Sequence, residues 1–237
     1  MNDTMDNTTR NVRHQLFQFY LRECRPPTTD ELAKASGMNV SEIPAILKKL
    51  EDLHHIVLYK HECAPTPIAM AHPFSHLPTS VVVSSGPRTW WANCTWCALG
   101  LASMLSPAES TVSIRSGSIG TQLQFVIQGD EVKCFTPQGE INASDCCVHF
   151  SVPPSTWWRD VRFACGTIQV FASRQEAHEW PAKRGFHSGD IISLETAWAL
   201  SKEWYHDKHE HGYNRKSAEE VKELYTRLGM TSDFWSS

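Results

Sequence analysis

The spacing of apolar residues changes near residue 62, and this change constrains the fold more than any other feature. Before it, helical spacing predicts three short helices over about residues 12–24, 30–35 and 41–53, followed by a strand over 56–60. Pro26, Pro27 and Gly37 separate these segments. We therefore predict a disordered tail over residues 1–11 and a winged-helix-like helical module over residues 12–62.

Past Pro65 the sequence alternates in the manner of strands. Strands are predicted over residues 77–85, 110–115, 122–128, 131–135, 147–152 and 166–172, and helices over 96–105, 173–180, 194–205 and 217–228. Ser173 with Glu176, and Ser217 with Glu220, have the spacing of helix-capping boxes. The predicted class is α+β, with a mixed or antiparallel β core and flanking helices over residues 63–237.

The composition is that of an ordinary globular protein rather than a dedicated nucleic-acid binder. The net charge is −4, and no apolar run is long enough for a signal sequence or a membrane span. We therefore expect a cytoplasmic protein without a membrane or nucleic-acid partner. In that compartment the eight cysteines should be reduced thiols, available for metal binding or catalysis.

Two cysteine pairs and one histidine run invite a metal-site interpretation. Cys94 and Cys97 form a C-x-x-C that could combine with Cys146 and Cys147 in a zinc site, but adjacent cysteines on a strand point to opposite faces. The histidine run, His206, His209 and His211, is more typical of a solvated helix end. We expect Cys94, Cys146 and Cys147 to be dispensable for catalysis, and Trp90, Trp91, Trp157 and Trp158 to form core or pocket wall.

Two segments resemble the organomercurial lyase (MerB, alkylmercury lyase) family. One is Trp96-Cys97-Ala98-Leu99; the other runs from Phe163 through Cys165 to Ser173 and into a helix ending at Trp180. Val112-Ser113 with Gly120, the stretch 190–204 and the N-terminal module are also similar to that family. The resemblance covers nearly the whole chain from residue 12.

The resemblance implies that Cys97 and Cys165 are catalytic and hold Hg(II) transiently. The family's catalytic aspartate falls at Gly100, and a structural cysteine of the family falls near Ser116. Soft thiolates are the preferred ligands of mercury, and a general acid must protonate the departing carbon. The implied reaction is protonolytic cleavage of a carbon–mercury bond to a hydrocarbon and Hg(II). It needs no organic cofactor, and small thiols or a mercuric reductase would accept the metal.

Gly100 leaves the proton donor open, because glycine has no side chain to donate one. An incoming thiol, water, or one of Asp145, Asp160 and Glu195 could replace the aspartate. Two other functions stay in view. One is a paralogue with different thiol chemistry or soft-metal sequestration; the other is a metal-responsive DNA-binding regulator using residues 12–62.

Overall fold

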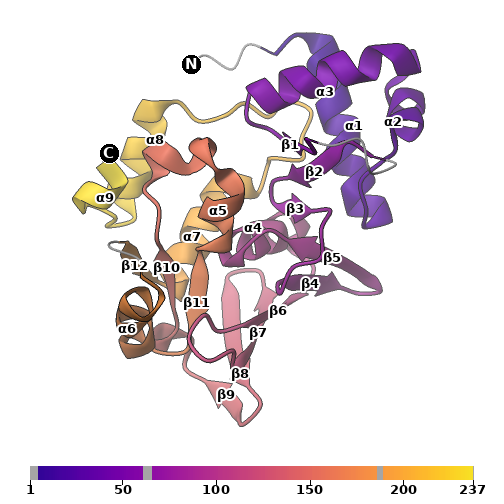
Figure 1. The fold of residues 1–237 in the computed structure, drawn as a ribbon. Coiled ribbons are helices and arrows are strands. Elements are labelled where there is room, and N and C mark those ends of the chain that lie inside the picture. Colours follow the sequence, from indigo (N-terminus) through magenta and orange to yellow (C-terminus); the bar gives the residue numbers. More distant parts are fainter. Residues whose placement is uncertain (1–4, 61–65, 186–188, 237) are drawn as a thin grey trace.

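The computed structural model describes residues 5–60, 66–185 and 189–236. Its N-terminal part is helical, with elements α1 (Asn7–Glu23), α2 (Thr29–Ser36), the 3₁₀ turn η1 (Val40–Glu42) and α3 (Ile43–Asp52) (Figure 1). Local signals set the ends of α2: Thr28 and Glu31 form a capping box, and Gly37 closes the helix in the left-handed conformation at φ 67°. The three predicted helices are therefore present.

The predicted tail is too long. The carboxylate of Asp6 accepts a hydrogen bond from the Thr9 N–H (2.7 Å), so α1 begins at Asn7 and residues 7–11 are helical. The first four residues of the predicted tail lie outside the described part of the chain.

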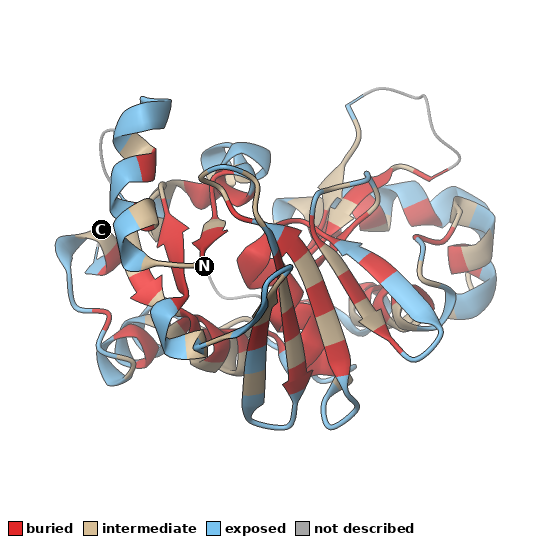
Figure 2. Ribbon diagram, turned by 90° about the horizontal axis from the view of Figure 1, so that it is seen from below, coloured by how far each residue is buried: buried red, intermediate tan, exposed pale blue. Residues whose placement is uncertain are grey.

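An antiparallel sheet of nine strands forms the main layer, in the order β1-β2-β3-β5-β4-β6-β7-β8-β9. The strands are β1 (Val57–Leu58), β2 (Ile68–Ala71), β3 (Phe74–Ser75), β4 (Val82–Ser85), β5 (Arg88–Ala92), β6 (Ser110–Arg115), β7 (Gln122–Gln128), β8 (Glu131–Thr136) and β9 (Gly139–Ile141). Alternate residues of β6 and β7 are buried, as their sequence pattern predicts (Figure 2). One face of this sheet is therefore packed on the core.

The helix α4 (Thr95–Leu105) lies at the centre of the molecule. Nearly all its residues are buried, because the run from Thr95 to Met104 is apolar or small on every side. It contacts strands of the large sheet and also α7 (Leu194–Tyr205). The N-terminus of α4 therefore lies deep inside the protein.

A second, three-stranded sheet packs on the other side of α7. Its order is β11-β10-β12, formed by β10 (Cys147–Phe150), β11 (Gln169–Phe171) and β12 (Asp190–Ser193). The remaining elements are η2 (Ala143–Asp145), η3 (Pro154–Arg159), α5 (Val161–Gly166), α6 (Arg174–Arg184), α8 (Ala218–Arg227) and α9 (Asp233–Ser236). The α+β class is confirmed.

Several predicted boundaries were wrong. Residues 166–168 do not belong to a strand: Cys165 lies in the last turn of α5, and β11 begins only at Gln169. Residues 77–81 precede β4, and the tryptophan-rich strand β5 was not predicted. The division into residues 12–62 and 63–237 stays a prediction, although β1 pairs with β2 and one hydrophobic core spans both parts.

Within the described ranges, no helix combines the length and apolar character needed to cross a bilayer.

Candidate active site

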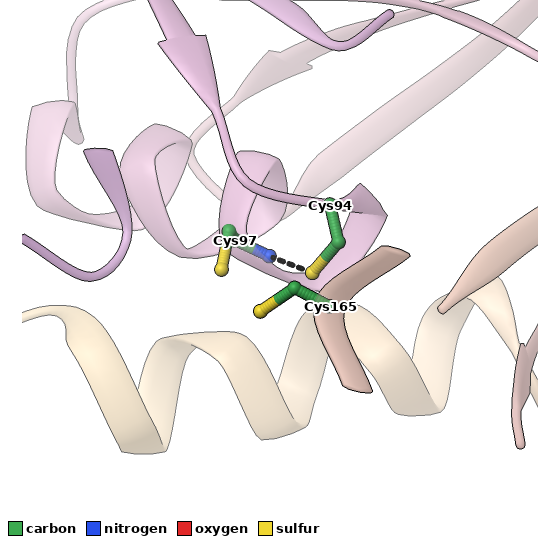
Figure 3. Close-up of side chains that lie close together, drawn as sticks. All are labelled: Cys94, Cys97 and Cys165. Carbon is green, nitrogen blue, oxygen red and sulfur yellow. Dashed lines mark hydrogen bonds between the residues drawn. The ribbon is translucent and has the colours of Figure 1, made fainter. Parts of the chain in front are cut away.

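Three cysteine sulfurs converge where α4 begins. The Sγ atoms of Cys94, Cys97 and Cys165 all lie within 4.8 Å of one another, and Figure 3 shows them facing a common space. All three residues are buried, with exposed fractions of 2%, 1% and 7%. The two cysteines predicted to share a metal ion are therefore brought together, and Cys94 lies beside them.

Backbone geometry aims these side chains at one another. Cys94 is the N-cap of α4, and its Sγ accepts a hydrogen bond from the Cys97 N–H (3.4 Å). Cys97, three residues on, projects from the first turn on the same side. Cys165 comes from α5, whose N-cap Asp160 accepts a hydrogen bond from the Phe163 N–H (3.0 Å).

Polar groups contact two of the sulfurs. The Tyr205 hydroxyl lies 3.6 Å from the Cys97 Sγ, and the Asn93 amide nitrogen donates to the same sulfur at 3.9 Å. His72 Nε2 lies 3.8 Å from the Cys165 Sγ. Burial lowers the pKa of His72 to about 4, so its ring is neutral at pH 7.

The three thiols do not share charge equally. Burial opposes ionisation of Cys97, but hydrogen bonding from the Cys165 and Cys94 thiols outweighs it and holds the pKa of Cys97 well below its usual range. The pKa of Cys165 is raised, chiefly by its hydrogen bonds to Cys94 and Cys97, and burial raises that of Cys94. These shifts favour a thiolate on Cys97 and protonated thiols on Cys94 and Cys165.

A pocket of about 110 Å³ opens onto this cluster. Four tryptophans line it, namely Trp96, Trp157, Trp158 and Trp204, together with His72, Cys165 and Tyr205. Lys208 and Arg215 also line it, and Asp207 is the one carboxylate among its lining residues. Trp157 and Trp158 are pocket wall as expected, whereas Trp90 is core and Trp91 is 41% exposed.

Gly100 has a packing role that the sequence did not reveal. A Cβ built at this position would lie 2.3 Å from Tyr205 Cδ2 and 2.5 Å from Tyr205 Cγ. The Tyr205 ring from α7 therefore fills the space beside Cys97 that a side chain at position 100 would need.

The other candidate residues lie elsewhere. The Cys146 Sγ contacts the Cys134 Sγ at 3.2 Å and the Cys147 Sγ donates to the Ser173 carbonyl at 3.6 Å, so the alternative zinc site is not formed. Among the described residues, the three cysteines bring their ligand atoms together and the three histidines of the run do not. Ser116 is buried, and its hydroxyl lies 3.5 Å from the Glu176 carboxylate.

The third helix of the N-terminal module has few free charges for a DNA backbone. Lys48 forms ion pairs with Glu51 and Asp52, and Lys49 pairs with Asp6. The module also packs on the rest of the chain, where the Trp90 indole donates to the Tyr20 carbonyl (2.7 Å). These contacts favour a structural role for the module.

Three buried thiols beside an aromatic pocket have the donor atoms that a soft metal prefers. The family model for alkylmercury lyase (MerB) matches residues 74–206, which is more than half of the sequence. The chain therefore belongs to the alkylmercury lyase family. The matched range contains Cys97, Gly100, Cys165 and Tyr205.

Comparison with solved structures supports the same fold. The chain is similar to the crystal structure of the mercury-bound form of MerB2, with a TM-score of 0.67 and 21% sequence identity over 87% of this chain and 94% of that one. No curated protein matches the chain by sequence. The prediction of an organomercurial lyase-type enzyme is confirmed by the family match.

Several residues of the site were not predicted, among them Cys94, His72, Tyr205 and Lys208. The C-x-x-C spacing at a helix start was a usable signal for Cys94, because residues three apart lie on one face of a helix. His72, Tyr205 and Lys208 carry no local signal, since they reach the site from segments distant in sequence.

Proposed function

We propose that this chain cleaves carbon–mercury bonds with Cys97 and Cys165 as the two reacting thiols. The observation that carries the proposal is their pair of sulfurs within 4.8 Å beside a tryptophan-lined pocket. Cys165 lines the pocket and Cys97 does not, but the Cys97 sulfur contacts the hydroxyl of Tyr205, which also lines it. The organomercurial enters through the pocket, and mercury bonds to both sulfurs.

The ionisation of the two thiols balances the reaction. A cation R–Hg⁺ reacts with the Cys97 thiolate and the Cys165 thiol to give a neutral Cys97–S–Hg–S–Cys165 group and R–H. Two Hg–S bonds form, while the Hg–C bond and the Cys165 S–H bond break. The pair of electrons of the Hg–C bond stays with carbon, which takes up the Cys165 proton.

The Cys165 thiol supplies the proton that an aspartate at position 100 would otherwise donate. A thiol that binds a metal ion becomes a strong acid, so coordination of Cys165 frees its proton where carbon departs. Asp145, Asp160 and Glu195 do not line the pocket. Asp145 lies in η2 near Cys146, and the side chain of Asp160 caps α5. These carboxyl groups are therefore poorly placed to act on the substrate.

Tyr205 assists the Cys97 thiolate. Burial, followed by the nearby cysteines, holds the pKa of Tyr205 well above its usual range, so its hydroxyl keeps its proton. From 3.6 Å it donates a hydrogen bond to the Cys97 sulfur. Tyr205 thus acts as a positioning residue in the space where the family places an aspartate side chain.

The substrate is a small organomercurial and the reaction requires no organic cofactor. We propose small thiols or a mercuric reductase as acceptors of the Hg(II), and the cytoplasm as the compartment, since the mechanism needs reduced cysteines.

The test is incubation of the reduced protein with methylmercury and excess small thiol, with methane measured in the headspace. Methane formation should depend on Cys97 and Cys165 and persist in Cys147→Ser, whose sulfur contacts Ser173 instead. Mercury binding without methane would instead favour sequestration of a soft metal on the same scaffold.

A further inference from the structure

Cys94 is a third thiol that the cleavage step does not use. Its sulfur lies within 4.8 Å of those of Cys97 and Cys165, and its exposed fraction is 2%. The sulfur is turned toward the other two sulfurs (Figure 3). A buried cysteine is ordinarily a small apolar filler, but here its sulfur faces two other potential metal ligands.

The position of Cys94 is unusual for a helix cap. Serine, threonine, aspartate and asparagine are the preferred N-caps, because their oxygens are good acceptors. Cys94 has extended backbone geometry (φ −162°, ψ −179°) and accepts the Cys97 N–H through sulfur at 3.4 Å. A hydroxyl would cap the helix better, whereas a sulfur adds a soft ligand at the same place.

We propose that Cys94, Cys97 and Cys165 form a three-thiolate site that holds Hg(II) in three-coordinate geometry. That the Hg(II) comes from cleavage of an organomercurial rests on the proposed function. The existence of the three-thiolate site does not depend on that function. When Cys94 joins the two-coordinate product, a third Hg–S bond forms and the Cys94 proton leaves to water through the pocket. The resulting mercury tris-thiolate carries one negative charge.

The pocket supplies positive charge for this anion. Lys208 is 6% exposed, and its ammonium lies 5.1 Å from the centre of the Tyr205 ring, which itself contacts Cys97. No hydrogen bond or ion pair of the Lys208 ammonium is found among the described residues. Arg215 lines the same pocket. An anionic complex is therefore favoured over a neutral one at this site.

The test supplies the ion directly, so that cleavage is not required. Half an equivalent of mercuric chloride is added to the reduced full-length protein, and the number of sulfur ligands is measured by X-ray absorption spectroscopy. We expect three sulfurs in the wild type and in Cys147→Ser, and two in Cys94→Ser, where the hydroxyl keeps the helix cap. Removal of Hg(II) by a competing dithiol should be at least ~10-fold faster in Cys94→Ser, corresponding to about 1.4 kcal/mol.

Two outcomes would overturn the three-thiolate site. They are two sulfur ligands in the wild type, or three in a folded Cys94→Ser protein. If Cys94→Ser does not fold, the wild-type coordination number and the Cys94→Ala variant decide the matter. A protein with three mercury-bound sulfurs that releases no methane from methylmercury would refute the proposed function and leave this site standing.

Discussion

Two sets of buried thiols differ in what surrounds them. Cys94, Cys97 and Cys165 meet at the start of α4, beside the tryptophan-lined pocket. Cys134 on β8 and Cys146 at the end of η2 are closer still, with sulfurs 3.2 Å apart. Yet the hollow beside Cys146 is lined by serines, Asp145 and Arg174, without an aromatic ring.

The surroundings decide whether a thiolate forms. The pKa of Cys146 is raised, first by its hydrogen bond to Cys134 and then by burial, with the Asp145 charge adding to both. The pKa of Cys97 is lowered, although that residue is also buried. Short sulfur–sulfur distances alone therefore do not identify a reactive site; a stabilised thiolate and an adjoining pocket do.

The largest expected effect tests this contrast between the two sets. Cys97→Ser should lower the rate of methane release from methylmercury by at least ~10³-fold, because a hydroxyl is a hard, protonated group with little affinity for mercury. Cys146→Ser should leave the rate within a few-fold. Melting temperatures show whether both variants are folded. If they are, and both lose the same fraction of the rate of methane release, the distinction between the two sets of thiols is wrong.

The next prediction concerns the contact between Gly100 and Tyr205. Gly100→Asp should destabilise the protein by about 3 kcal/mol, since its Cβ would overlap the Tyr205 ring. The double variant Gly100→Asp with Tyr205→Ala should fold better. It should also cleave methylmercury up to ~10²-fold faster than Tyr205→Ala alone, because it restores a general acid. Denaturant unfolding and single-turnover assays measure the two effects, and a fully stable Gly100→Asp protein would contradict the packing argument.

The sequence predicted the helices and strands that carry the site better than the side chains that line the pocket. Alternation of buried residues predicted β6 and β7, and the predicted caps at Ser173 and Ser217 mark real helix starts. These features depend on neighbours within a few residues. The resemblance then placed Cys97 and Cys165 in one site.

The remaining features depend on tertiary packing. Gly100 meets Tyr205 across the contact between α4 and α7, and nothing near either residue in the sequence indicates that meeting. The six-residue helix α5 was not predicted, and the predicted strand began at its last residue, Gly166. Its helical form follows from the Asp160 cap and from packing on η3.

A smaller effect should follow from loss of one hydroxyl group. Tyr205→Phe keeps the ring against Gly100 but removes the donor to the Cys97 sulfur. A hydrogen bond to a charged group contributes about 1.5–3 kcal/mol, so the cleavage rate should fall by roughly 10- to 100-fold. The pKa of Cys97 should rise, which alkylation rates measured against pH would show. An unchanged pH profile would mean that the hydroxyl does not act on the thiolate.

The smallest predicted effect concerns Lys208, a buried positive charge near Cys97 and Cys165 that has no counterpart beside Cys134 and Cys146 among the residues lining that hollow. Burial, with Arg13 and Arg215 nearby, lowers the pKa of Lys208 from 10.5 to about 7. In the unfolded chain this amine stays protonated up to about pH 10.5. Between those values the unfolded state binds more protons than the folded state, so rising pH favours folding.

From pH 7 to pH 8 this linkage should add on the order of 1 kcal/mol to the stability of the wild type. Denaturant unfolding at the two pH values measures the change in stability of the wild type and of Lys208→Met, which lacks the amine. The contribution of Lys208 is the difference between these two changes. Lys222→Met, at an exposed position of α8, should keep the wild-type increment. If Lys208→Met gains as much stability as the wild type over this interval, the amine is not buried in the folded protein.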